Sequence, residues 1–74
     1  MATIHINRRE YHAQASELTG EQILGLAGIG TDHDLFFLQG EGDRSGGTPI
    51  ALTEPFPIRN GEHFRAIPGD RNFG

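Results

Sequence analysis

Several residue types are missing from this sequence of 74 residues, and each absence excludes a class of protein. There is no cysteine, which excludes a disulfide framework, a thiolate nucleophile and a cysteine-rich zinc site. No apolar run approaches the ~20 residues of a membrane span. The N-terminus also lacks the basic region and apolar stretch of a secretory signal. We therefore expect a cytoplasmic protein that does not act at a membrane.

Lysine is also absent, and all six basic residues are arginine. The formal net charge is −4, which is the wrong sign for a protein that must neutralise phosphates, so we expect no nucleic-acid partner. Without lysine, these residues hold no side-chain amine that could accept an isopeptide bond.

The apolar content is sufficient for one small core. Leu, Ile and Phe together make 18 of the 74 residues, above the fraction of roughly 20% below which chains tend to be disordered. A domain of this size buries only about 60% of the surface that its unfolded chain exposes. A deep catalytic cavity is therefore not expected, and we predict that the protein is not itself an enzyme.

Alternating apolar and polar residues predict five strands. The first two form a hairpin joined by a turn of about four residues, 7–10. The third is apolar on both faces, as in the middle of a sheet, and the fourth contains a proline that suits an edge. In the last strand Phe64 and Ala66 share one face, and His63, Arg65 and Ile67 share the other. The predicted strands are residues 3–7, 11–14, 34–39, 48–53 and 62–67.

One helix of about two turns is predicted after Thr19. Thr19 suits the N-cap, and Gln22 stands three residues later, as in a capping box. Gly28 suits a left-handed C-terminal cap. Gly25 lies inside the helix, where glycine costs about 1 kcal/mol relative to alanine. We expect a close approach of helix to sheet at Gly25.

The order of these elements predicts an α+β protein with a β-grasp fold, in which a mixed sheet of four to five strands packs on one helix. This domain is expected to span residues 1–67. Residues 68–74 show no periodicity and are predicted to form a flexible tail, which could reach about 23 Å at ~3.3 Å per residue.

The four histidines do not predict a metal centre. His5 and His12 could face each other across the first hairpin, but no third ligand has a suitable spacing. His33 beside Asp34 would need a nucleophile and a cleft to act as a catalytic pair. We therefore expect neither a metal site nor a catalytic residue.

Several segments resemble the bacterial ubiquitin-like domains called multiubiquitin. The segment Leu18-Thr19-Gly20-x-Gln22-Ile23-Leu24-x-Leu26-Ala27-Gly28 carries the resemblance most specifically, with support from Ile4-x-Ile6, Tyr11, Asp34-Leu35, Gly61-Glu62-x-Phe64 and Pro68. It covers about residues 3–68. In that family such domains occur in operons with relatives of ubiquitin-activating and ubiquitin-conjugating enzymes and a peptidase.

The resemblance implies a protein modifier whose reactive group is the carboxylate of Gly74. A separate E1-like activating enzyme would adenylate it with ATP and Mg²⁺, and an E2-like conjugating enzyme would transfer it to a target protein. A deconjugating or processing peptidase is a further implied partner. The modifier itself would need no cofactor. The tail that partners would read is Pro68, Gly69, Asp70, Arg71, Asn72 and Phe73.

Two other functions remain open at this point. One is a β-grasp interaction module that is never conjugated and binds partners through its sheet, with Arg65, Ile67, Phe36 and Leu38 as candidate contacts. The other is a sulfur carrier that takes a thiocarboxylate at its terminal glycine. Ubiquitin and the sulfur carriers usually end in Gly-Gly, whereas this sequence ends in Phe73-Gly74.

Overall fold

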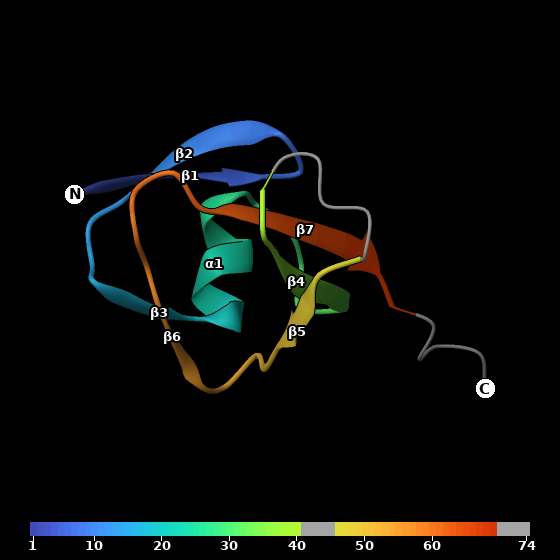
Figure 1. Cartoon of the computed structure of the whole chain (residues 1–74). Coiled ribbons are helices and arrows are strands. Elements are labelled where there is room, and N and C mark those ends of the chain that lie inside the picture. Colours follow the sequence, from blue (N-terminus) through green and yellow to red (C-terminus); the bar gives the residue numbers. More distant parts are fainter. Residues whose placement is uncertain (41–45, 70–74) are drawn as a thin grey trace.

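The computed structural model describes residues 1–40 and 46–69 (Figure 1). None of these residues forms a helix long and apolar enough to cross a membrane. Within these two ranges the chain forms seven strands and one helix. In order they are β1 (Ala2–Ile6), β2 (Arg9–Ala13), β3 (Glu17–Thr19), α1 (Gly20–Leu26), β4 (His33–Leu38), β5 (Thr48–Ile50), β6 (Pro55–Pro57) and β7 (His63–Pro68).

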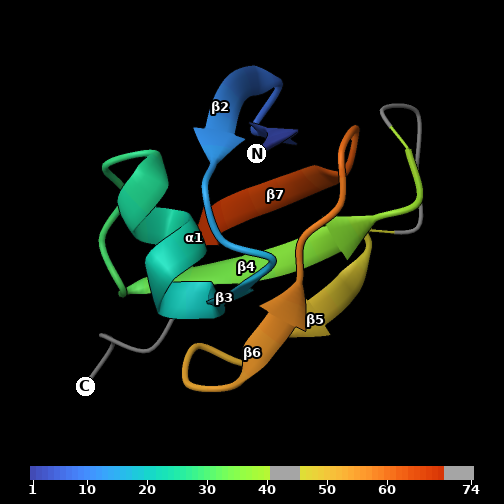
Figure 2. The same cartoon turned by 90° about the vertical axis from the view of Figure 1, so that its left-hand side faces the viewer.

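The main sheet has five strands in the order β2-β1-β7-β4-β5. β1 and β7 are parallel, and the other neighbours are antiparallel. The last strand of the described chain therefore lies at the centre of the sheet, and α1 lies across one face (Figure 2). This arrangement confirms the predicted β-grasp fold with a mixed sheet and one helix. β5 lies at an edge, as predicted from its proline.

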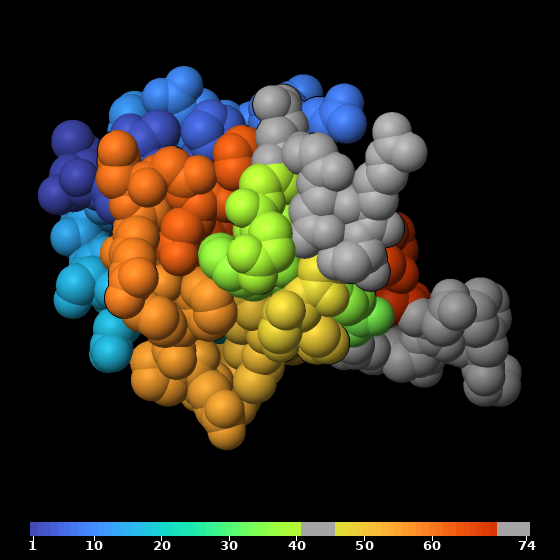
Figure 3. All heavy atoms as spheres, viewed as in Figure 1, coloured from blue at the N-terminus to red at the C-terminus, as the bar shows by residue number. Residues whose placement is uncertain are grey.

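β3 and β6 form a second, two-stranded sheet that the sequence analysis did not predict. They pair antiparallel, with Leu18 opposite Phe56. Both strands have three residues, and β6 begins and ends with proline. Such a segment has little intrinsic strand preference. In the space-filling view, the yellow and orange residues from β5 onward cover much of the visible surface (Figure 3).

The helix has the predicted caps at both ends. The Thr19 hydroxyl accepts a hydrogen bond from the Gln22 amide at 3.2 Å, and the Gln22 side chain accepts one from the Thr19 amide at 2.9 Å. At the other end Gly28 has a φ of 70°. The Ile29 amide donates to Leu24 O, and the Gly28 amide donates to Gly25 O. These two bonds make a Schellman motif, which ends the helix.

The close approach expected at Gly25 occurs instead at Gly20. Gly25 is exposed, and a Cβ there would meet no atom within 4 Å. Gly20 is buried, and a Cβ there would lie 2.6 Å from the carbonyl oxygen of Ala51. The prediction for Gly25 was wrong because Gly25 lies on the solvent side of α1, whereas the first helical residue meets the chain after β5.

The first hairpin turn is shorter than predicted. β1 ends at Ile6 and β2 begins at Arg9, so only Asn7 and Arg8 form the turn. Both have positive φ, 53° and 69°, as in the type I′ turns that match the twist of paired strands. The four-residue estimate was wrong because it treated Arg9 and Glu10 as turn residues, and both pair with β1.

The core lies between α1 and the main sheet. Phe64 is 1% exposed and lies in β7, between the buried Ile6 of β1 and the half-buried Phe37 of β4. Ile23 and Leu24 of α1 are fully buried in the same cluster. The ring of Phe56 lies 5.8 Å from that of Phe64 and 5.2 Å from that of Phe37. The small second sheet therefore contributes to the core through Phe56.

Candidate functional site: the outer face of the sheet

β7 divides its side chains between the two faces of the sheet. Phe64 and Ala66 are buried on the inner face. Arg65 pairs with Phe36 of β4, and Ile67 pairs with Asp34. Paired residues in a sheet point to the same side, so these four side chains share the face opposite to α1. We call this the outer face.

The structure brings together the four contact residues predicted for an interaction surface. Arg65, Ile67, Phe36 and Leu38 all lie on the outer face. Their exposure differs: Arg65 is exposed, Ile67 is 41% exposed, and Phe36 is half-buried. Leu38 is only 8% exposed, so it offers little contact area. This burial does not follow from strand alternation.

Two histidines form a stacked pair on the same face. His5 of β1 and His63 of β7 are register partners in the parallel pair. Their rings lie 4.5 Å apart with an interplanar angle of 14°. The Nδ1 atom of His5 is buried and has no hydrogen-bond partner within the described ranges. Sequence spacing pointed to His12 as a neighbour of His5 and gave no sign of His63, because the β1–β7 pairing joins residues far apart in the chain.

The remaining histidines have local polar neighbours. Nδ1 of His12 lies 3.3 Å from the Thr3 hydroxyl. Nδ1 of His33 lies 2.9 Å from a carboxylate oxygen of Asp32. Among residues 1–40 and 46–69, no three His, Asp or Glu side chains are grouped so that they could hold a metal ion.

The start of the predicted tail is part of the sheet. Pro68 is the last residue of β7 and pairs with His33 at the start of β4. The Gly69 amide donates to the carbonyl oxygen of Asp32 at 3.0 Å. The other predicted tail residues and the conjugation residue, Asp70, Arg71, Asn72, Phe73 and Gly74, lie outside the described residues. The described chain therefore ends, at Gly69, beside the loop that precedes β4.

A comparison with protein families places the chain in a known family. The family model described as Multiubiquitin matches residues 2–69, which cover all the described elements. No curated protein and no solved structure matches the chain significantly.

Proposed function

The chain belongs to the Multiubiquitin family, and from this premise we propose that it is a protein modifier that is attached to targets through the carboxylate of Gly74. The family match over residues 2–69 carries the proposal. The fold is consistent with it, because the central strand β7 leads into residues 70–74. These five residues lie beyond the matched range. Their role in attachment therefore needs an experiment. A free carboxylate at Gly74 is required, whether present from synthesis or exposed by a peptidase.

The proposed chemistry takes place in partner enzymes. An oxygen of the Gly74 carboxylate attacks the α-phosphorus of ATP, and pyrophosphate leaves as the bond to the β-phosphate breaks. The product is a mixed anhydride with AMP, a much better leaving group than oxide. A cysteine thiolate of an E1-like enzyme then attacks the carbonyl carbon and displaces AMP. Transfer to an E2-like cysteine and then to a target nucleophile releases each thiol in turn.

This chain would supply a surface that the partner enzymes recognise and a C-terminal end narrow enough to enter their active sites. Glycine at the reacting position has no Cβ, so the tail can enter a confined channel in conformations closed to other residues. Arg71 would offer a bidentate contact to a carboxylate, and Phe73 would fill an apolar pocket of the partner. The 74 residues hold no lysine, so a chain of modifiers joined through lysine side chains cannot form on them.

The test is reconstitution with a candidate E1-like enzyme, sought first among the products of neighbouring genes. The purified chain is incubated with that enzyme, ATP and Mg²⁺, and pyrophosphate release and intact mass are measured. We expect pyrophosphate release and a covalent product on the enzyme that is cleaved by a thiol reductant. Deletion of Gly74 should abolish both without altering the circular dichroism spectrum.

Two other outcomes would contradict the proposal in different ways. A free chain isolated from its own cells with a mass raised only by the difference between sulfur and oxygen would identify a sulfur carrier. No pyrophosphate release, with an enzyme shown to be active and a folded chain, would leave an interaction module that is not conjugated.

A further inference from the structure

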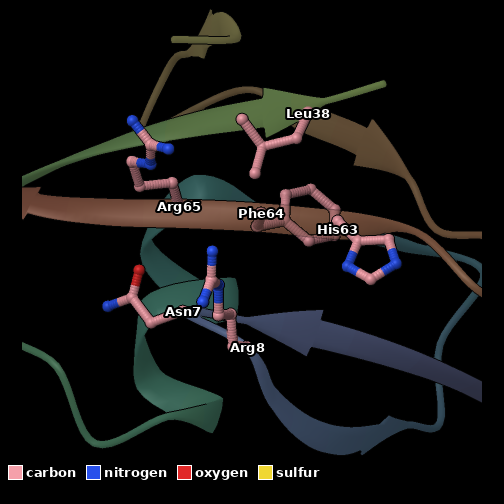
Figure 4. A pocket seen from close by; sticks show the side chains of 6 residues that line it. All are labelled: Asn7, Arg8, Leu38, His63, Phe64 and Arg65. Atoms are coloured by element: carbon pink, nitrogen blue, oxygen red, sulfur yellow. The ribbon is translucent and has the colours of Figure 1, made fainter. Parts of the chain in front are cut away.

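A small cavity opens on the outer face over the first half of β7, between the first hairpin turn and the end of β4. Its volume is about 170 Å³. The turn residues, the end of β4 and the first half of β7 all contribute to its wall (Figure 4). The lining residues are Asn7, Arg8, Leu38, His63, Phe64 and Arg65. Pockets for nucleotides or other cofactor-sized ligands usually have volumes of about 300–1,000 Å³. The cavity is therefore suited to one side chain or a small ion.

The wall of the cavity is positively charged within an acidic chain. Two of its lining side chains, those of Arg8 and Arg65, carry guanidinium groups. None of the described residues that line it is acidic, although the chain holds 10 Asp and Glu residues against 6 arginines. Over the described ranges, neither Arg8 nor Arg65 makes a side-chain hydrogen bond or ion pair. The ligand that would complement these two cationic side chains is an anion.

Arg8 occupies a conformation that a smaller residue would adopt more easily. Its φ is 69°, and a residue with a Cβ in this left-handed region costs about 1–2 kcal/mol. Glycine is the usual second residue of a type I′ turn. Arginine at this position places a guanidinium over the cavity (Figure 4). Backbone strain of this kind clusters at ligand sites, where the surrounding structure maintains it.

Asn7 fixes the strained turn to the central strand. The Ala66 amide donates to Asn7 Oδ1 at 2.9 Å, and Asn7 Nδ2 donates to Ala66 O at 3.1 Å. These two bonds bridge residues 59 positions apart. They hold the turn that carries Arg8 beside the strand that carries Arg65, so the two cationic groups border one preorganised site.

We propose that this cavity binds the carboxylate of a glutamate or aspartate in an acidic segment of a partner protein. Guanidinium groups pair with carboxylates through charge-assisted hydrogen bonds. Nucleic acid is disfavoured as the partner because the chain as a whole is acidic. None of the described lining residues belongs to the tail, so the proposal does not require conjugation.

The test is a titration of the ¹⁵N-labelled chain, followed by amide chemical shifts. The probes are the blocked peptide acetyl-Glu-Glu-Leu-amide and its counterpart acetyl-Gln-Gln-Leu-amide. We expect the glutamate peptide to shift the amides of residues 7–8, 38 and 63–65, with an affinity about tenfold above that of the glutamine peptide, as for the loss of a charge-assisted hydrogen bond.

Variants of the cavity residues distinguish specific binding in the cavity from non-specific electrostatic attraction to the chain. Arg8→Gly and Arg65→Gln should each weaken binding of the glutamate peptide about tenfold. Arg59→Gln removes the same charge from an exposed residue outside the cavity and should change the affinity less than twofold. Arg8→Gly should also melt at or above the parent temperature, because it relieves the positive φ.

Three results would overturn the proposal. The first is equal affinity for the two peptides. The second is an equal loss of affinity for the glutamate peptide in Arg59→Gln and Arg65→Gln. The third concerns the source of the anion: if inorganic phosphate at the same concentration shifts the cavity amides more than the glutamate peptide does, the ligand is a free anion and not a protein side chain.

Discussion

The two faces of the central strand differ in almost every respect. On the inner face Phe64 and Ala66 are buried under α1, in a cluster that is entirely apolar. On the outer face Arg65 and Ile67 are exposed, and His63 stacks on His5. Successive residues of one strand thus serve different purposes. The inner face holds the fold together, and the outer face presents the exposed side chains of Arg65 and Ile67.

This division can be tested most strongly at two adjacent positions. Phe64→Ala should lower the free energy of unfolding by about 3–5 kcal/mol, because it leaves a cavity among buried side chains. A domain of this size has a total stability of roughly 4–11 kcal/mol, so Phe64→Leu is the variant to use if the alanine variant does not fold. Arg65→Ala should change stability by no more than about 0.5 kcal/mol. Urea denaturation measures all three, and a comparable loss at Arg65 would refute the division.

Gly20 allows the start of α1 to pack closely against the chain that follows β5. A Cβ at this position would lie 2.6 Å from a backbone oxygen, which cannot move away as a flexible side chain can. Gly20→Ala should therefore destabilise the protein by about 1–3 kcal/mol, as other overpacked sites do. Thermal unfolding followed by circular dichroism would show this, and an unchanged melting temperature would mean that the segment at Ala51 shifts freely.

The outer face should contain residues that are not optimal for stability. His5 stacks on His63 but buries an Nδ1 atom without a partner in the described structure. His5→Phe keeps an aromatic ring and removes the unsatisfied atom, so the free energy of unfolding should rise by about 1 kcal/mol. His5→Ala serves as the control that removes the ring as well. A loss of stability in the phenylalanine variant would show that the imidazole nitrogen is satisfied in solution.

The smallest effect is expected on the exposed side of the helix. A Cβ at Gly25 would meet no neighbour within 4 Å, so Gly25→Ala should stabilise the protein by about 0.5 kcal/mol through helix propensity alone. Denaturation at equilibrium detects a change of this size. Gly20→Ala and Gly25→Ala compare the same substitution on two sides of one short helix. Changes of equal sign in the free energy of unfolding would contradict the packing described above.

Local patterns predicted those parts of the fold that depend on neighbours in sequence. The alternation around Ile4 and around Phe64 gave the correct faces of β1 and β7, and Thr19 with Gln22 gave the helix start. The β3–β6 pairing could not be predicted, because two segments of three residues pair only once the rest of the fold aligns them. The two-residue turn was missed because Arg8 is an unusual residue at a positive φ.

The candidate sites were predictable to different degrees. Strand alternation placed Arg65 and Ile67 on one face of the last strand, whereas the side of Phe36 and Leu38 was left open until the pairing of β4 with β7 was known. The burial of Leu38 depends on its tertiary neighbours. The cavity between Arg8 and Arg65 could not be predicted. The cavity forms because β7, a strand from the other end of the chain, pairs in parallel with β1.

The parallel contact between β1 and β7 also determines how the protein responds to force. The two strands are joined by backbone bonds from the His5 amide to Glu62 O at 2.8 Å and from the Asn7 amide to Phe64 O at 3.0 Å. Tension applied between the start of β1 and the end of β7 would load these bonds side by side, in shear, so that they must rupture together. If the protein is attached through its C-terminal end, a force acting between that end and the start of β1 would load the domain in shear.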